Sequence, residues 1–139
     1  MSGIKSLESI VKKVTSLTPV TRAAGTANGT AFDAKGMGDI LVTQIAGVAT
    51  ATGTGDVTIQ DSADNSTFAA IAGATFPQVV AALDDRTWYG VLRKGSYRRY
   101  VRASLVVGTD NVIVGVDLFG FAPQDSELAG KAAGSEFEV

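Results

Sequence analysis

The sequence contains no cysteine and no histidine among its 139 residues. Without cysteine the chain forms no disulfide and offers no thiolate nucleophile or soft metal ligand. Without histidine it lacks the commonest general base, the Ser-His-Asp triad and imidazole metal sites. No run of about 18 uncharged apolar residues is present, so a membrane-spanning helix is not expected. These absences predict a protein that is not an enzyme, binds no cofactor or metal, and has no membrane segment.

The remaining composition is typical of one folded, β-rich domain. Hydrophobic residues make up 45% of the chain and charged residues only 19%, which favours a buried core over disorder. Sixteen glycines, three prolines and many threonines and valines favour short strands joined by tight turns. The net charge of −2 is opposite in sign to that of a basic nucleic-acid-binding protein, which disfavours nucleic acid as a partner.

Charge divides the chain into three zones. Residues 1–22 carry a net charge of +3, residues 23–121 a net charge of −2, and residues 122–139 a net charge of −3. We interpret these zones as an N-terminal arm, a folded body and a C-terminal tail. Arms of opposite charge could attract neighbouring subunits in an assembly, although two solvated tails would show the same pattern.

Apolar residues recur in the arm at the three- to four-residue spacing of one helix face. A helix of about three turns is marginal alone in water, so it needs a partner surface on its own body or on another chain. Thr18 and Pro19 should end it, because the residue before proline avoids the α region. The pattern predicts a short amphipathic helix and an interface formed by Ile4, Leu7, Ile10, Val11 and Val14.

In the body the apolar period changes to two, and turn signals recur about every 8–14 residues. Val57 and Ile59 alternate with polar neighbours, and Phe68 is a candidate core residue. In the last segment, one face is formed by Val112, Val114, Val116 and Leu118. The predicted fold class is all-β: an antiparallel β-sandwich, jelly-roll or immunoglobulin-like, with the N-terminal arm and an extended C-terminal tail.

Two acidic clusters are candidate sites. Asp61, Asp64 and Asn65 supply the hard oxygen ligands that calcium prefers. The EF-hand spacing and its closing glutamate are absent, however, and a polar turn explains the same residues without a metal. Asp84 and Asp85 would point to opposite faces of a strand, so a turn is also the better interpretation there.

Half of the basic residues lie between Arg86 and Arg102 with no acidic residue among them. Residues 93–96 are expected to close a hairpin, and the candidate interface on it comprises Arg93, Lys94, Arg98, Arg99 and Arg102. It could contact an acidic protein neighbour or remain solvated, with arginine stems covering tyrosines. Single-stranded nucleic acid is a weaker alternative, stacked on aromatic residues interleaved with the arginines: Trp88, Tyr89, Tyr97 and Tyr100.

Three ordered motifs resemble small head proteins of tailed bacteriophages. They are G-T-A-F-D-A-K-G at residues 29–36, V-T-I-Q-D-S-A-D-N-S-T-F at residues 57–68 continuing to Phe76, and R-Y-V-R at residues 99–102. The resemblance covers about residues 20–121 and implies a β-sandwich decoration, or cement, protein. Such proteins often sit as trimers over junctions between major capsid subunits, with an N-terminal arm reaching to neighbours.

The resemblance implies the major capsid protein as partner, a homo-oligomer with a trimer favoured, and a location on the outer surface of the virion after synthesis in the bacterial cytoplasm. A cement role suits a chain without histidine or cysteine, since many modest contacts give avidity without an active site. The alternatives are a tail-tube or other virion subunit, or a module that binds carbohydrate or single-stranded nucleic acid through the basic aromatic segment.

Overall fold

The computed structural model describes residues 11–121 and 135–139. The described chain is made of β-strands and one short 3-10 helix, joined by turns. In chain order these are β1 (Val11–Arg22), β2 (Gly25–Asn28), β3 (Phe32–Asp33), β4 (Ile40–Ala49), β5 (Thr54–Ser62), β6 (Ala69–Thr75), η1 (Ala81–Leu83), β7 (Arg86–Leu92), β8 (Tyr100–Gly108), β9 (Val112–Phe121) and β10 (Ser135–Glu138).

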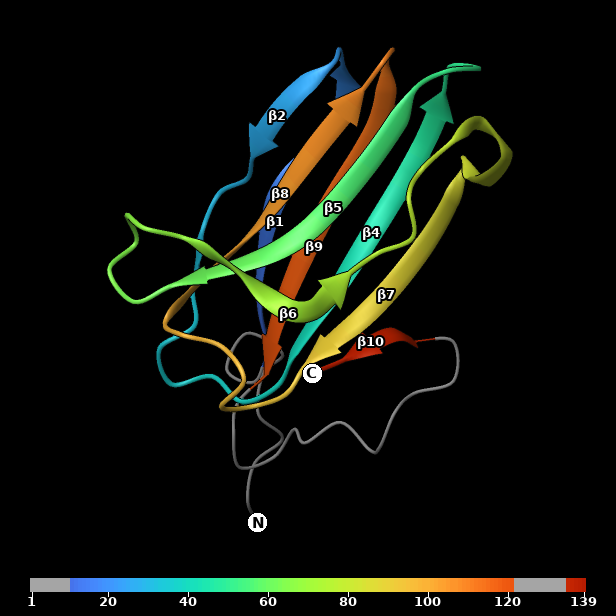
Figure 1. Cartoon of the computed structure of the whole chain (residues 1–139). Coiled ribbons are helices and arrows are strands. Elements are labelled where there is room, and N and C mark those ends of the chain that lie inside the picture. Colours follow the sequence, from blue (N-terminus) through green and yellow to red (C-terminus); the bar gives the residue numbers. More distant parts are fainter. Residues whose placement is uncertain (1–10, 122–134) are drawn as a thin grey trace.

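The strands form two sheets that face one another (Figure 1). One sheet has the order β1-β9-β4-β7-β10, and the other has the order β2-β8-β5-β6, with β3 also pairing with β8. Among the described strands every pair is antiparallel except β10 with β7. The all-β, antiparallel sandwich predicted from the sequence is confirmed.

The order of pairing is nested. Without β3 and β10, the first strand pairs with the last, β1 with β9, and the second pairs with the second-last, β2 with β8. Inside these lie β4 with β7 and then the hairpin of β5 and β6. The chain is therefore one long antiparallel hairpin folded over on itself, and most connections cross from one sheet to the other.

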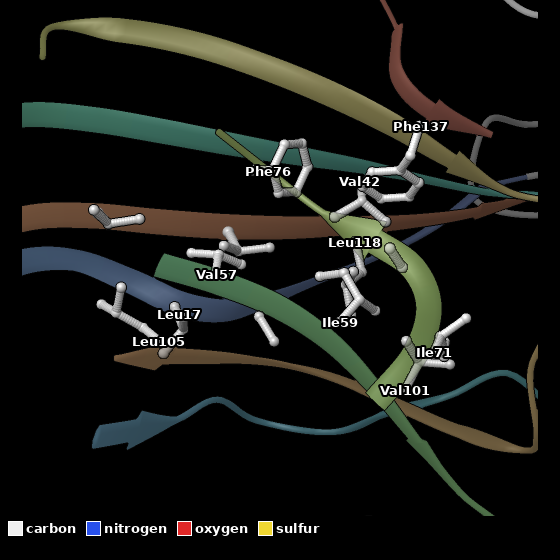
Figure 2. Close-up of a cluster of buried hydrophobic side chains, with 14 of the residues drawn as sticks. Leu17, Val42, Val57, Ile59, Ile71, Phe76, Val101, Leu105, Leu118 and Phe137 are labelled. Atoms are coloured by element: carbon white, nitrogen blue, oxygen red, sulfur yellow. The ribbon is translucent and has the colours of Figure 1, made fainter. Parts of the chain in front are cut away.

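The core lies between the sheets and follows the two-residue period (Figure 2). Val57 and Ile59 are buried as predicted, and so is the predicted inward face of β9: Val112, Val114, Val116 and Leu118. Burying one such side chain contributes about 1.5–3 kcal/mol relative to leaving it exposed. Phe68 differs from its prediction, because it precedes β6, is only half-buried and packs under an arginine rather than in the core.

The predicted N-terminal helix is not found in the described residues. Val11 and Val14 lie in β1, opposite Phe121 and Leu118 of β9, and Ile4, Leu7 and Ile10 lie outside the described residues. The segment is rich in β-branched valine and threonine, and an edge position beside β9 favours a strand over a short, marginal helix.

Two local features fix β1 in the sandwich. The register shifts between Thr15 and Leu17, and Ser16 turns inward, where its hydroxyl donates to the Thr30 carbonyl at 2.9 Å and accepts from the Ala103 N–H at 2.9 Å. Pro19 is tolerated because β1 is an edge strand, and its ring covers Gly115 so closely that a side chain at residue 115 would collide with it. Residues 11–22, expected in the arm, are thus an integral strand of the body.

Candidate interaction surface

The basic segment predicted as a hairpin is a loop between the two sheets. β7 pairs with β4 and β10, whereas β8 pairs with β2, β3 and β5, so residues 93–99 cross from one sheet to the other. Gly95 has a φ of 89°, which favours glycine, and it allows the loop to turn. The hairpin prediction was wrong because the same turn residues serve a tight hairpin and a crossing loop.

Arg93 holds the start of this loop against a buried aspartate. Its guanidinium lies 2.7 Å from a carboxylate oxygen of Asp39, which is only 4% exposed, and the Lys94 N–H donates to the other carboxylate oxygen at 2.9 Å. The Tyr97 hydroxyl donates to the Gly38 carbonyl nearby. Burial, and secondly the Asp39 charge, raise the pKa of Tyr97 to about 12, so this hydroxyl stays a donor at neutral pH.

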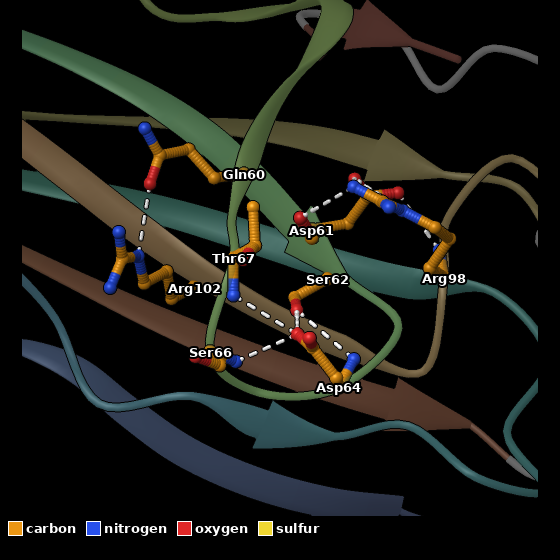
Figure 3. Close-up of polar contacts among 8 residues, drawn as sticks. All are labelled: Gln60, Asp61, Ser62, Asp64, Ser66, Thr67, Arg98 and Arg102. Atoms are coloured by element: carbon orange, nitrogen blue, oxygen red, sulfur yellow. Dashed lines mark hydrogen bonds and ion pairs between the residues drawn. The ribbon is translucent and has the colours of Figure 1, made fainter.

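Arg98 and Arg99 are also each paired with an aspartate, and Figure 3 shows the pairing of Arg98 with Asp61. Arg98 donates from Nε and Nη2 to one Asp61 oxygen at 3.2 and 2.9 Å, and its backbone N–H donates to the other at 2.9 Å. Arg99 makes a two-pronged contact with Asp33 at 3.0 and 2.9 Å. The hydrogen bonds from Arg99 are the main reason that the pKa of Asp33 is lowered to about 2. Hydrogen bonding to Asp61 raises the pKa of Arg98.

Arg102 lies apart on β8 and is held by stacking. Its guanidinium carbon is 3.9 Å from the centre of the Phe68 ring, and its Nε donates to the Gln60 side-chain carbonyl at 2.9 Å. A cation over an aromatic face is attracted by the electron-rich ring. The half-buried Phe68 is therefore a platform for this arginine, which the sequence alone did not indicate.

These contacts change the electrostatic character of the predicted basic interface. Arg93, Arg98 and Arg99 each face an aspartate distant in the sequence, which neutralises much of the local positive charge. The side chains of Arg98 and Arg99 still have 48% and 44% of their surface exposed, so they can be reached by a partner while holding the loop. Their place in an interface stays a prediction.

The aromatic residues of this region do not form an exposed row. Trp88, Tyr89, Tyr97 and Tyr100 are all partly buried, and Trp88 and Tyr97 pack against the core. Trp88 and Tyr89 belong to β7 in one sheet, and Tyr100 begins β8 in the other. Stacking of several bases on adjacent rings, which the nucleic-acid alternative requires, is not favoured by this arrangement.

The acidic cluster after β5 is organised as a turn (Figure 3). One carboxylate oxygen of Asp64 accepts hydrogen bonds from the Ser62 hydroxyl and from the N–H groups of Ser66 and Thr67, at 2.8, 2.9 and 3.0 Å. These bonds, led by the one from Thr67, lower the pKa of Asp64 to about 2. Asn65 has a φ of 60°, as a tight turn requires. Asp61, the other calcium candidate, faces Arg98.

The sequence reasoning missed the attachment of the C-terminal tail. Ser135–Glu138 pairs with β7, and Phe137 is 5% exposed, with its ring 5.1 Å from that of Phe76 in an edge-to-face contact. The available signal was a lone aromatic residue alternating with Glu136 and Glu138, which is the pattern of a short strand with one apolar face.

A few large apolar side chains are exposed. Ile45 and Val48 lie on β4 and Val20 on β1 of the same sheet, whereas Val106 lies on β8 of the other sheet. Ile45 and Val48 are 37% and 59% exposed and only three residues apart on one strand. They make the outer side of the sheet that contains β4 the more apolar candidate for a protein contact.

No known family model matches the chain, and a search of curated proteins finds no significant match. Within the described residues no helix has both the length and the apolar character needed to cross a bilayer.

Proposed function

We propose that this protein is a structural virion protein, which binds the outer surface of a bacteriophage capsid and stabilises the shell by bridging neighbouring major capsid subunits. The observation that carries the proposal is the nested strand order. Eight strands, β1, β2 and β4–β9, pair first with last in two four-stranded layers. We infer that the sandwich is a jelly roll, an architecture of viral capsid and lectin domains.

The charged contacts support a scaffolding role. Asp33, Asp39 and Asp61 lie close to strand ends, and each binds an arginine at or near the β7–β8 loop. These pairs hold the β7–β8 loop, which connects the two sheets, and help to give a body of defined shape. A decoration protein needs such a body because it gains avidity from several modest contacts made at once, which requires that all of them keep the right spacing.

The experiment is co-sedimentation with purified expanded capsids that lack this protein. Residues 1–10 of the arm are tested by deletion, using residues 11–139, because Val11 begins β1 and a longer deletion would remove a strand of the sandwich. We expect saturable binding by the full-length chain and weaker binding by the shortened one. Absence of binding by both forms would refute the proposal. Unchanged binding by residues 11–139 would show that residues 1–10, including Ile4, Leu7 and Ile10, do not contribute to attachment.

A second pair of variants locates the capsid-facing side. Ile45→Lys with Val48→Lys places charge on the exposed apolar part of β4, and Val106→Lys is the matched control on the opposite sheet. We expect the β4 variant to lose binding and the control to retain it. The reverse result would place the contact on the sheet that contains β8. Rings or tubes formed by the protein alone would instead favour a tail-tube subunit.

A further inference from the structure

The C-terminal strand occupies a slot beside β7 through a small set of contacts. β10 runs parallel to β7, with Ser135 opposite Tyr89 and Glu138 opposite Val91. Two backbone bonds close the end: the Val139 N–H donates to the Val91 carbonyl at 3.0 Å, and the Arg93 N–H donates to the Val139 carbonyl at 2.5 Å. Without β10, β7 would be an edge strand with unpaired backbone groups.

The slot is shaped for the Phe137 ring. The Phe137 ring fills the space beside Gly90, where any side chain larger than hydrogen would collide with it. Phe76, which follows β6, forms the other wall and meets the ring edge to face (Figure 2). The tail therefore has one apolar anchor and a short strand, the two elements by which a peptide adds to an open sheet edge.

The chain between the body and this strand is longer than the slot requires. In the sheet, β9 and β10 are separated by β4 and β7, which is about 15 Å at ordinary strand spacing. The offset along the strands increases the separation to about 20 Å. The fourteen steps from Phe121 to Ser135 can extend to about 46 Å. The tail can thus reach well beyond the slot of its own chain.

We propose that β10 is exchanged between copies of this chain, so that Ser135–Val139 of one copy fills the slot beside β7 of the next. The contacts made in the slot are the same whether the strand comes from its own chain or from a neighbour, so exchange costs little beyond association. Donation from each copy to the next is a head-to-tail interaction, which closes into a ring when the rotation allows. The inference concerns self-association and does not depend on capsid binding.

The test uses the natural absence of cysteine, because every thiol is then an introduced one. Two separate proteins, Ser135→Cys and Tyr89→Cys, are mixed at about 10 µM, oxidised gently and examined by intact mass. Exchange places these two residues side by side across two chains, at an effective concentration of about 1 mM. We expect the heterodimer to form on the order of a hundredfold faster than by random collision.

The matched control is the mixture of Thr26→Cys with Val106→Cys. These exposed residues are also strand neighbours, but they lie in β2 and β8 within the body and cannot exchange without unfolding it. Heterodimer formation at the control rate would overturn the proposal. Adding Phe137→Ala to Ser135→Cys should lower the rate of heterodimer formation to that of the control. This variant separates binding in the slot from a general attraction between chains. Should Tyr89→Cys fail to fold, Val91→Cys with Glu138→Cys supplies the second neighbouring pair.

Discussion

Replacement of Gln44 by methionine should stabilise this protein. Gln44 lies in the middle of β4, with Val42 and Ala46 as inward neighbours, and is fully buried. Neither its side-chain nitrogen nor its side-chain oxygen has a hydrogen-bond partner among the described residues. Most buried polar groups in proteins are hydrogen-bonded, so an unpartnered amide between two sheets is costly.

The magnitude follows from the two polar atoms. A buried donor or acceptor without a partner costs about 1–3 kcal/mol. Methionine keeps the length of the side chain and carries neither group, and such volume-conserving changes cost less than about 1.5 kcal/mol in packing. The two groups together cost about 2–6 kcal/mol, and a packing cost of up to about 1.5 kcal/mol is subtracted from this. We therefore expect Gln44→Met to raise the free energy of unfolding by at least about 0.5 kcal/mol, which corresponds to roughly 2 °C or more in Tm for a domain of this size.

Urea unfolding followed by circular dichroism measures this effect. The midpoint should rise with an unchanged m-value, since the folded surface stays the same. Thr43→Met is the matched control, because Thr43 is the outward, half-buried neighbour on the same strand, where the change should stay within about 0.5 kcal/mol. A lower midpoint for Gln44→Met would refute the reasoning, because it would show that the amide makes favourable bonds in solution.

Three further predictions concern other contacts. Gly115→Ala should lower the free energy of unfolding by about 1–3 kcal/mol by forcing Pro19 away, and Pro19→Ala should restore part of the loss in a double-mutant urea series. Because Arg99 lowers the pKa of Asp33 to about 2, the contribution of Asp33 to stability should be full above pH 4 and lost as the pH falls toward 2. The substitution Asp33→Asn should therefore flatten the plot of urea midpoint against pH over this range. The pKa of Tyr97 is raised to about 12, so this residue should ionise late in an absorbance titration. Its contribution to stability should be full below pH 10 and lost as the pH rises through 12. Ionisation of Tyr97 near pH 10 would contradict the buried hydroxyl.

The fold class could be predicted because it depends on local pattern. The alternation of Val112, Val114, Val116 and Leu118 requires only that one face of a strand be buried, and the structure buries it. The pairing of strands could not be predicted in this way, because β-branched residues and glycine turns mark where strands begin and end but not which sheet they join. The loop at Gly95 was therefore mistaken for a hairpin.

The β1 error has a related cause. Val11 and Val14 are three residues apart, a spacing that places them on one face of a helix. In β1 they pair in continuous register with Phe121 and Leu118 and therefore lie on opposite faces of the sheet. Only the neighbour across the sheet, β9, decides between helix and strand. The partners of the basic residues are equally remote in sequence: Asp61 is 37 residues from Arg98, and Asp33 is 66 residues from Arg99. A run of like charge was visible from the sequence, but its neutralisation was not.

The same charge pairs bear on how the C-terminal strand would move between copies. Arg93 binds Asp39 at the start of the β7–β8 loop, and its backbone N–H receives the end of the tail at Val139. The ion pair between the Arg93 side chain and Asp39 holds this residue, and thus its N–H group, in place. The same would hold whether the tail comes from the same chain or from another. Gly90 and Phe76 also belong to the body, so the walls of the slot are supplied by the body and not by the tail. Preorganisation of this kind reduces the cost of binding to that of ordering the tail. The buried ion pair that removes a charge from the predicted interface thus favours a different association, in which the sheet edge, rather than the basic side chains, recognises the neighbour.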